Sequence, residues 1–133
     1  MKISAIANLF LATILLVANS FALADTHAGT WVKKSNKIHG NWAIETRDDG
    51  RYLVLDEKFK TRNAPDLKFV LSNTPVSEVN GRNAMQGALI IEPLKSNKGS
   101  QSYKLPDNFD DYSTLLLHCE QYSKLWGAAS LTH

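Results

Sequence analysis

Few side chains in this sequence could do chemistry, and the most distinctive is Cys119, the single cysteine of the 133 residues. It directly follows His118 in the stretch LLLHCEQYSKLWGAASL, residues 115–131. An ionised thiol can be a nucleophile, a redox group or a metal ligand, and an imidazole can be a base or a ligand. The pair therefore marks either a functional site or a core position beside an ordinary histidine.

The pattern of residues 114–120 is typical of a β-strand, in which successive side chains point to opposite faces. Cys119 then shares a face with Leu117, and His118 shares the other face with Glu120. We expect Cys119 to face the core and His118 to lie on the wetter side, so they are poor partners for each other. Because apolar surroundings make a thiol inert, the pattern favours a structural cysteine over a ligand, a redox group or an intermolecular disulfide.

Templates for other chemistry are missing from the sequence. It has no glycine-rich phosphate loop, no paired-cysteine zinc pattern, no two-histidine helix motif and no Gly-x-Ser-x-Gly elbow. We therefore predict no metal site and no hydrolytic or transferase activity. The acidic residues with calcium-like clustering fit turn and capping roles better; they are Asp48, Asp49, Asp107, Asp110 and Asp111.

The N-terminal residues have the layout of a secretory signal peptide. Lys2 precedes an apolar stretch at residues 6–18, and an Ala-Leu-Ala step ends at Ala24. We expect cleavage between Ala24 and Asp25 and a periplasmic or extracellular protein. The apolar stretch is shorter than the roughly 20 residues of a membrane span, so no transmembrane segment is expected after cleavage.

Removing 24 of the 133 residues leaves 109, enough for one domain, residues 25–133, with one core. The chain has 15 basic and 13 acidic residues, and loss of Lys2 leaves 14 basic ones. A nearly neutral chain is not expected to bind nucleic acid. A single cysteine cannot form an intramolecular disulfide, so packing alone must hold the fold together.

Short runs of β-branched and aromatic residues, separated by Gly, Pro, Asn and Asp, predict an all-β protein. We expect an antiparallel β-sandwich of about eight strands, with a small β-barrel as the alternative. The expected strands are residues 30–34, 41–47, 51–56, 67–72, 88–92, 100–105, 114–120 and 125–131.

Three local features sharpen this prediction. The stretch NWAIETRDDGRYLVLD predicts a hairpin whose turn is centred on Asp49 and Gly50. Residues 73–87 form a long polar connection, a kind of loop that is often functional, and residues 76–80 could form a short helix. The stretch LPDNFDDYS suggests a helical turn capped by Asp107.

Three motifs, taken together and in this order, resemble the DM13 domain. They are Phe-Lys-Thr with Pro-Asp-Leu at residues 59–67, Lys-Gly-Ser-Gln-Ser-Tyr at residues 98–103, and the single Cys119 followed by Trp126-Gly127. The resemblance covers residues 29–131. The chain departs from the family pattern at Ala64, where glycine is usual, and at His118, where tryptophan is common. Asn36 replaces the histidine of an early His-x-x-x-Gly motif.

The resemblance implies a β-sandwich that acts in electron transfer or oxidative modification at the cell surface, with Cys119 at its centre. Cys119 would act as a bare thiol at the rim, activated by Lys124 or His118, or as a ligand to a prosthetic group such as haem, with His118 nearby. The thiol is favoured, because a small core has little room for a macrocycle. A redox or cell-envelope protein would be the partner, and a Cys119-linked dimer is a further option.

An adhesion or ligand-binding module is the alternative. In that case Cys119 is only part of the core, and the loop at residues 73–87 supplies the binding surface.

Overall fold

The computed structural model describes residues 27–131. The expected signal peptide, residues 1–24, lies outside the described residues. No helix within residues 27–131 is long and apolar enough to cross a membrane.

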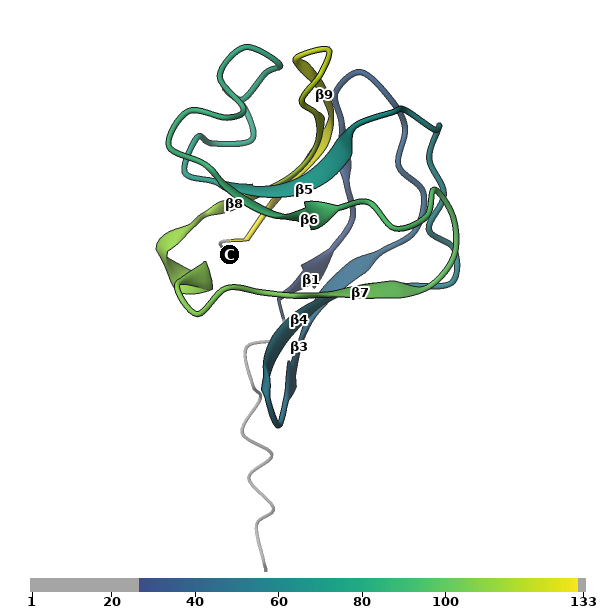
Figure 1. Ribbon diagram of the computed structural model, residues 1–133, viewed down its shortest axis with the longest axis vertical. Coiled ribbons are helices and arrows are strands. Elements are labelled where there is room, and N and C mark those ends of the chain that lie inside the picture. The colour runs from purple at the N-terminus through teal and green to yellow at the C-terminus, as the bar shows by residue number, and fades with distance from the viewer. Residues whose placement is uncertain (1–26, 132–133) are drawn as a thin grey trace, which may run out of the picture.

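Two antiparallel sheets form the fold (Figure 1). The four-stranded sheet has the order β1-β3-β4-β7 and the five-stranded sheet the order β2-β9-β8-β5-β6. The strands are β1 Ala28–Gly29, β2 Val32–Lys33, β3 Trp42–Arg47, β4 Gly50–Leu55, β5 Leu67–Ser72, β6 Leu89–Pro93, β7 Gln101–Lys104, β8 Thr114–Cys119 and β9 Lys124–Ser130. The sandwich prediction is confirmed; the barrel alternative is wrong, because the sheets do not close on each other. The very short strand β1 was not predicted.

The predicted hairpin is present, but its turn lies one residue earlier than expected. Arg47 pairs with Gly50, so Asp48 and Asp49 are the two turn residues. Neither aspartate has a positive φ, whereas Gly50 has a φ of 140°. The glycine therefore supplies its conformational freedom at the start of β4 rather than inside a type I′ turn.

The main core lies between the two sheets, where alternate residues of facing strands meet. Trp42 and Ile44 of β3 and Leu53 and Leu55 of β4 point inward from the four-stranded sheet. The five-stranded sheet contributes leucine and aromatic side chains from β5, β8 and β9. Burial of this apolar surface is the main driving force for a fold that has no disulfide.

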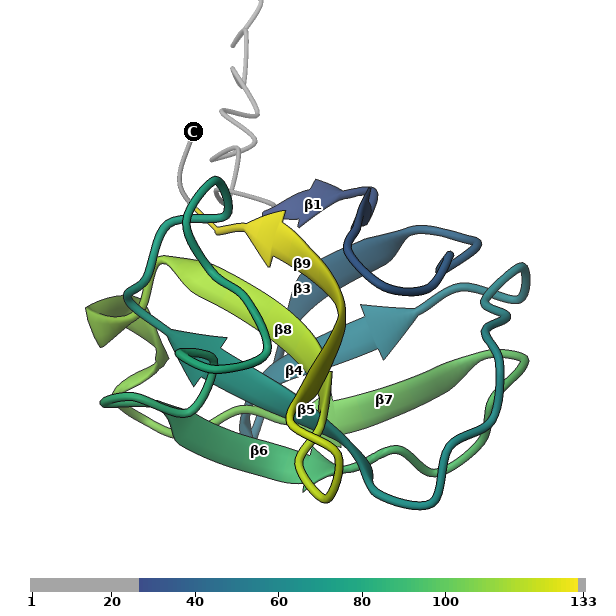
Figure 2. The same cartoon turned by 90° about the horizontal axis from the view of Figure 1, so that it is seen from above.

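The connection at residues 73–88 covers the outer face of the five-stranded sheet, as Figures 1 and 2 show. Its Val79 and Ala84 form a second buried cluster with Val70 and Leu116. A Cβ atom on Gly81 would collide with the Ser123 carbonyl oxygen, so this loop touches the β8–β9 turn closely. Strand β8 is consequently buried on both faces.

Two helical expectations need correction. No helix forms over residues 76–80, where turns carry the chain and Val79 N donates to Pro75 O. The expected helical turn is present as the 3-10 helix η1, Phe109–Asp111. Its N-cap residue is Asn108, with no side-chain capping bond, so the capping role predicted for Asp107 is wrong.

Candidate functional site

Cys119 is the last residue of β8 and points into the main core, as its strand position predicted. Its side chain is 0 % exposed. In the register of the sheet it lies between Leu67 of β5 and Lys124 of β9. Leu117 and Trp126 belong to the same buried cluster. The thiol is thus a buried group at the very end of a strand, one residue from an exposed turn.

Asp66 holds the turn that follows Cys119. Its backbone oxygen accepts a hydrogen bond from Glu120 N at 3.3 Å, and its Oδ2 accepts one from Gln121 N at 2.9 Å. Lys68 Nζ lies 3.2 Å from Asp66 Oδ1 and 2.6 Å from Glu120 Oε2. Hydrogen bonds to Glu120 and then Asp66 raise the pKa of Lys68. The aspartate of the Pro-Asp-Leu motif therefore holds in place the turn that follows the thiol-bearing end of β8.

A β-bulge turns Trp126 into the core. Leu117 of β8 pairs with Gly127, while the next residue, His118, pairs with Leu125, so Trp126 is the extra residue. Bulges often redirect a side chain beside a functional site. A Cβ atom on Gly127 would lie 2.6 Å from the Ile38 side chain, which explains why the bulge carries a Trp-Gly pair.

Thr61 receives the redirected tryptophan. Trp126 Nε1 donates to Thr61 Oγ1 at 3.0 Å, and this hydroxyl donates to Lys37 O at 2.9 Å. The backbone of Thr61 is bound on both sides by Asn97, whose oxygen accepts from Thr61 N at 2.9 Å and whose Nδ2 donates to Thr61 O at 3.3 Å. Buried Thr61 thus joins four chain segments, which come from far apart in the sequence.

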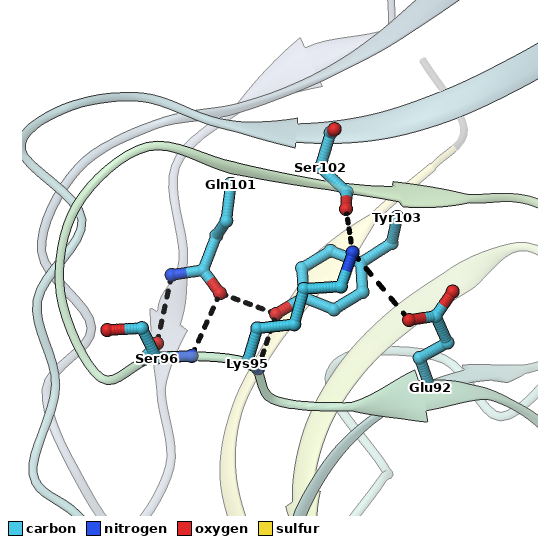
Figure 3. A network of polar contacts seen from close by, with 6 residues as sticks. All are labelled: Glu92, Lys95, Ser96, Gln101, Ser102 and Tyr103. Carbon is cyan, nitrogen blue, oxygen red and sulfur yellow. Dashed lines mark hydrogen bonds and ion pairs between the residues drawn. The ribbon is translucent and has the colours of Figure 1, made fainter.

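The Lys-Gly-Ser-Gln-Ser-Tyr motif serves the same end of the molecule (Figure 3). Tyr103 is 0 % exposed, and its hydroxyl donates to Gln101 Oε1 and accepts from Lys95 N at 2.8 Å. Lys95 Nζ donates to Ser102 O at 2.6 Å and lies 4.6 Å from the centre of the Tyr103 ring. Burial raises the pKa of Tyr103. The network fixes the β6–β7 connection, which carries Asn97 to Thr61.

His118 lies on the opposite face of β8 from Cys119, as predicted, but it is not on a wet surface. Its side chain is 1 % exposed, and Nδ1 is buried without a hydrogen-bond partner among the described residues. The strand pattern could not show this, because residues 73–88 fold back over that face. Burial lowers the pKa of His118; Glu120 and Asp66 partly oppose the shift, and Lys68 adds to it.

The surroundings of Cys119 do not fit a haem. Core side chains fill the space around the thiol, and Cys119 lines none of four surface pockets found within residues 27–131. His118, the other expected ligand, points away on the far face of the sheet. Across the described residues, no three His, Cys, Asp or Glu side chains are grouped so that they could hold a metal ion.

Sequence reasoning did not assign roles to Thr61 and Asp66, although both lie in the motifs that it singled out. Thr61 is a short polar residue between a lysine and an arginine, and Asp66 follows a proline before a strand. Such positions signal hydrogen bonding to backbone or to another buried group. Their partners, Trp126 and Gln121, lie more than fifty residues further along the chain, so only the folded structure identifies them.

Comparison with known proteins adds one match. The model of the family described as Electron transfer DM13 matches residues 30–131. No curated protein and no solved structure matches the chain.

The hydrogen bond between Trp126 and Thr61 can be tested with Thr61→Val. This change keeps the side-chain shape but leaves the buried indole N–H without an acceptor, which costs about 1–3 kcal/mol. We expect the free energy of unfolding, measured in urea, to fall by this amount. The control is Thr46→Val, at an exposed position of β3, with a change within about 0.5 kcal/mol. Equal effects of the two substitutions would contradict the role given to Thr61.

Burial of His118 predicts a pH-dependent stability. The pKa of His118 is lowered in the folded chain. Below pH about 6.5 the unfolded chain therefore binds a proton more readily than the folded chain, and the free energy of unfolding must decrease as the pH is lowered. The slope from this group is at most about 1.4 kcal/mol per pH unit. His118→Gln should flatten the dependence between pH 7 and 5, while the control Thr46→Val, which removes no titratable group from an exposed position, should not. An unchanged slope in His118→Gln would refute the assignment.

Proposed function

Since this chain belongs to the DM13 family, which is described as an electron-transfer family, we propose that it transfers electrons through the thiol of Cys119. The observation that carries the proposal is the convergence of three distant motifs at the end of β8. Thr61 binds Trp126, Asp66 holds the turn after Cys119, and Asn97, which directly precedes the Lys-Gly-Ser-Gln-Ser-Tyr motif, binds Thr61. Residues in or next to all three motifs thus hold the strand end that bears the thiol, and burial shields the thiol from nonspecific oxidation.

The proposed form of the centre is a bare thiol, since the surroundings do not fit a haem. Cys119 is one residue from the turn, so local opening of residues 120–123 would expose the sulfur without unfolding the sandwich. The ionised thiol then attacks a disulfide of the partner protein, one partner sulfur leaves as a thiolate, and a mixed disulfide forms. A thiolate of a second protein, a dithiol, attacks the Cys119 sulfur and releases the first partner as a dithiol that has gained two electrons. The other thiolate of this second protein then displaces the Cys119 thiolate and forms that protein's own disulfide, so the second protein has lost two electrons. Each exchange breaks one S–S bond and forms another.

The second candidate function is that of an adhesion or ligand-binding module in which Cys119 is only part of the core, and one observation supports it. Cys119 is 0 % exposed among apolar side chains, as expected for a structural cysteine in a binding module. The loop at residues 73–87, which is the binding surface expected for such a module, gives less support, because its Val79 and Ala84 are buried against the sheet. A Cys119-linked dimer would need the same opening of the turn, and a reducible dimer on a gel would report it.

Local opening can be measured by the reaction of Cys119 with 5,5′-dithiobis(2-nitrobenzoate). We expect a slow reaction in the native protein whose rate hardly changes in low urea, because little surface is exposed in the opening. Asp66→Ala removes the acceptor of Gln121 N and should raise the rate about 5–30-fold, for a loss of about 1–2 kcal/mol. Reaction with glutathione disulfide should give the mixed disulfide by mass.

The control for this measurement is Asp110→Ala. It removes a comparable exposed ion pair, 2.6 Å from Asp110 Oδ1 to Arg51 Nη1, at the other end of the sandwich, and should leave the rate unchanged. A thiol that reacts only as fast as the whole protein unfolds, with the matching steep dependence on urea, would favour the structural cysteine and eliminate the redox role.

Export is the remaining part of the proposal, and the layout of residues 1–24 supports it. We expect the chain, expressed in a bacterial host, to be recovered from the periplasm or medium with Asp25 as its first residue. N-terminal sequencing checks this, and Ala24→Arg should block processing. A cytoplasmic protein that keeps its first 24 residues would show that the segment is no signal peptide.

A further inference from the structure

Basic side chains gather where the loops between strands meet. An open pocket of about 270 Å³ is lined by Lys37, His39, Lys60, Thr61 and Arg62. Two isolated bridges build its floor, since residue 39 pairs with residue 60, and residue 60 pairs with residue 98, a further lysine. The connections β2–β3, β4–β5 and β6–β7 supply these residues and lie together on one side of the molecule (Figures 1 and 2).

The charges of this basic patch, defined as Lys37, Lys60, Arg62 and Lys98, are not neutralised. All four side chains are exposed. Within residues 27–131, none of them forms an ion pair; the basic residues that do are Arg47, Arg51, Lys68, Lys95 and Lys104. Four adjacent positive charges in a nearly neutral chain produce a local positive potential that attracts an anionic surface.

The chemistry of the pocket is not that of a small-anion site. Such a site needs donors fixed in position, often backbone N–H groups that point at the anion. Here Thr61 N, Thr61 Oγ1 and His39 N are all used in hydrogen bonds inside the protein. The positive charges sit on long flexible side chains, an arrangement suited to a broad, multivalent contact.

We propose that the basic patch is the docking surface for a carboxylate-rich face of the protein that exchanges electrons with this chain. This inference rests on the proposed electron-transfer function, which requires a protein partner. Complementary charge steers such partners together and sets their orientation, especially in small transient redox complexes.

Docking at the patch would also bring the partner to the end of the molecule that holds Cys119. Thr61 lies in the pocket and is bonded to Trp126, which belongs to the same buried cluster as Cys119. A partner seated on the loop connections therefore contacts the side from which Asp66 holds the turn. The patch orients the partner, whereas the thiol carries the chemistry.

The patch can be tested with a fluorescent poly-L-glutamate of about 20 residues as the probe. We expect binding to the full chain at about 20 mM ionic strength and its loss at about 300 mM, where charges are screened within a few ångströms. The triple variant K37E/K60E/R62E should bind at least about 10-fold more weakly at low salt. These residues are exposed, so a folded protein is expected, and circular dichroism checks it.

The matched control is R47E/R82E/K104E, which makes the same change in net charge at exposed positions outside the patch. Weakening of similar size in both triple variants would overturn the proposal, as would tighter binding of a single-stranded DNA of equal charge. Cys119→Ala should bind the probe like the parent. Loss of patch binding and loss of thiol reactivity are therefore separate results, and each refutes a different proposal.

Discussion

The hydrogen bond between Trp126 Nε1 and Thr61 Oγ1 is the contact on which the loop end of this molecule depends. An indole N–H buried without an acceptor would be costly, so the bulge that turns Trp126 inward requires a partner from another segment. Thr61 meets this need and in turn anchors Lys37 and Asn97. One buried polar contact thereby fixes the relative positions of three loops and the end of the strand pair that bears the cysteine.

Strand β8 is buried on both faces, but the two faces offer different environments. The inner face carries Cys119 into the leucine-rich core between the sheets, whereas the outer face carries His118 beneath the loop at residues 73–88. Lys68 binds Asp66 and Glu120 at the edge of that outer face. A thiol and an imidazole that are neighbours in sequence are therefore separated by the backbone of the sheet and cannot act on the same atom.

Charge is distributed unevenly even though the chain is nearly neutral. Several basic side chains are paired with carboxylates near β4, β5 and β7, while the four side chains of the basic patch form no ion pair within residues 27–131. Asp66 and the basic patch thus carry opposite charges and have different roles at one end of the sandwich. The carboxylate stabilises the closed turn, and the unpaired cations form the docking surface that we propose for a partner. Both features agree with the proposal that a partner docks before the buried thiol becomes accessible.

Alternation of apolar and polar residues determined the β-sandwich, most strand positions and the inward direction of Cys119, because these depend on local geometry that repeats every two residues. The motifs at residues 59–67, 98–103 and 119–127 also identified the family. Tertiary structure decided the rest. Burial of His118 depends on a loop that returns over the sheet, and the position of Trp126 depends on a bulge and on a threonine 65 residues away. Contacts between distant segments arise only when the chain closes on itself, so the two-residue period could not reveal them.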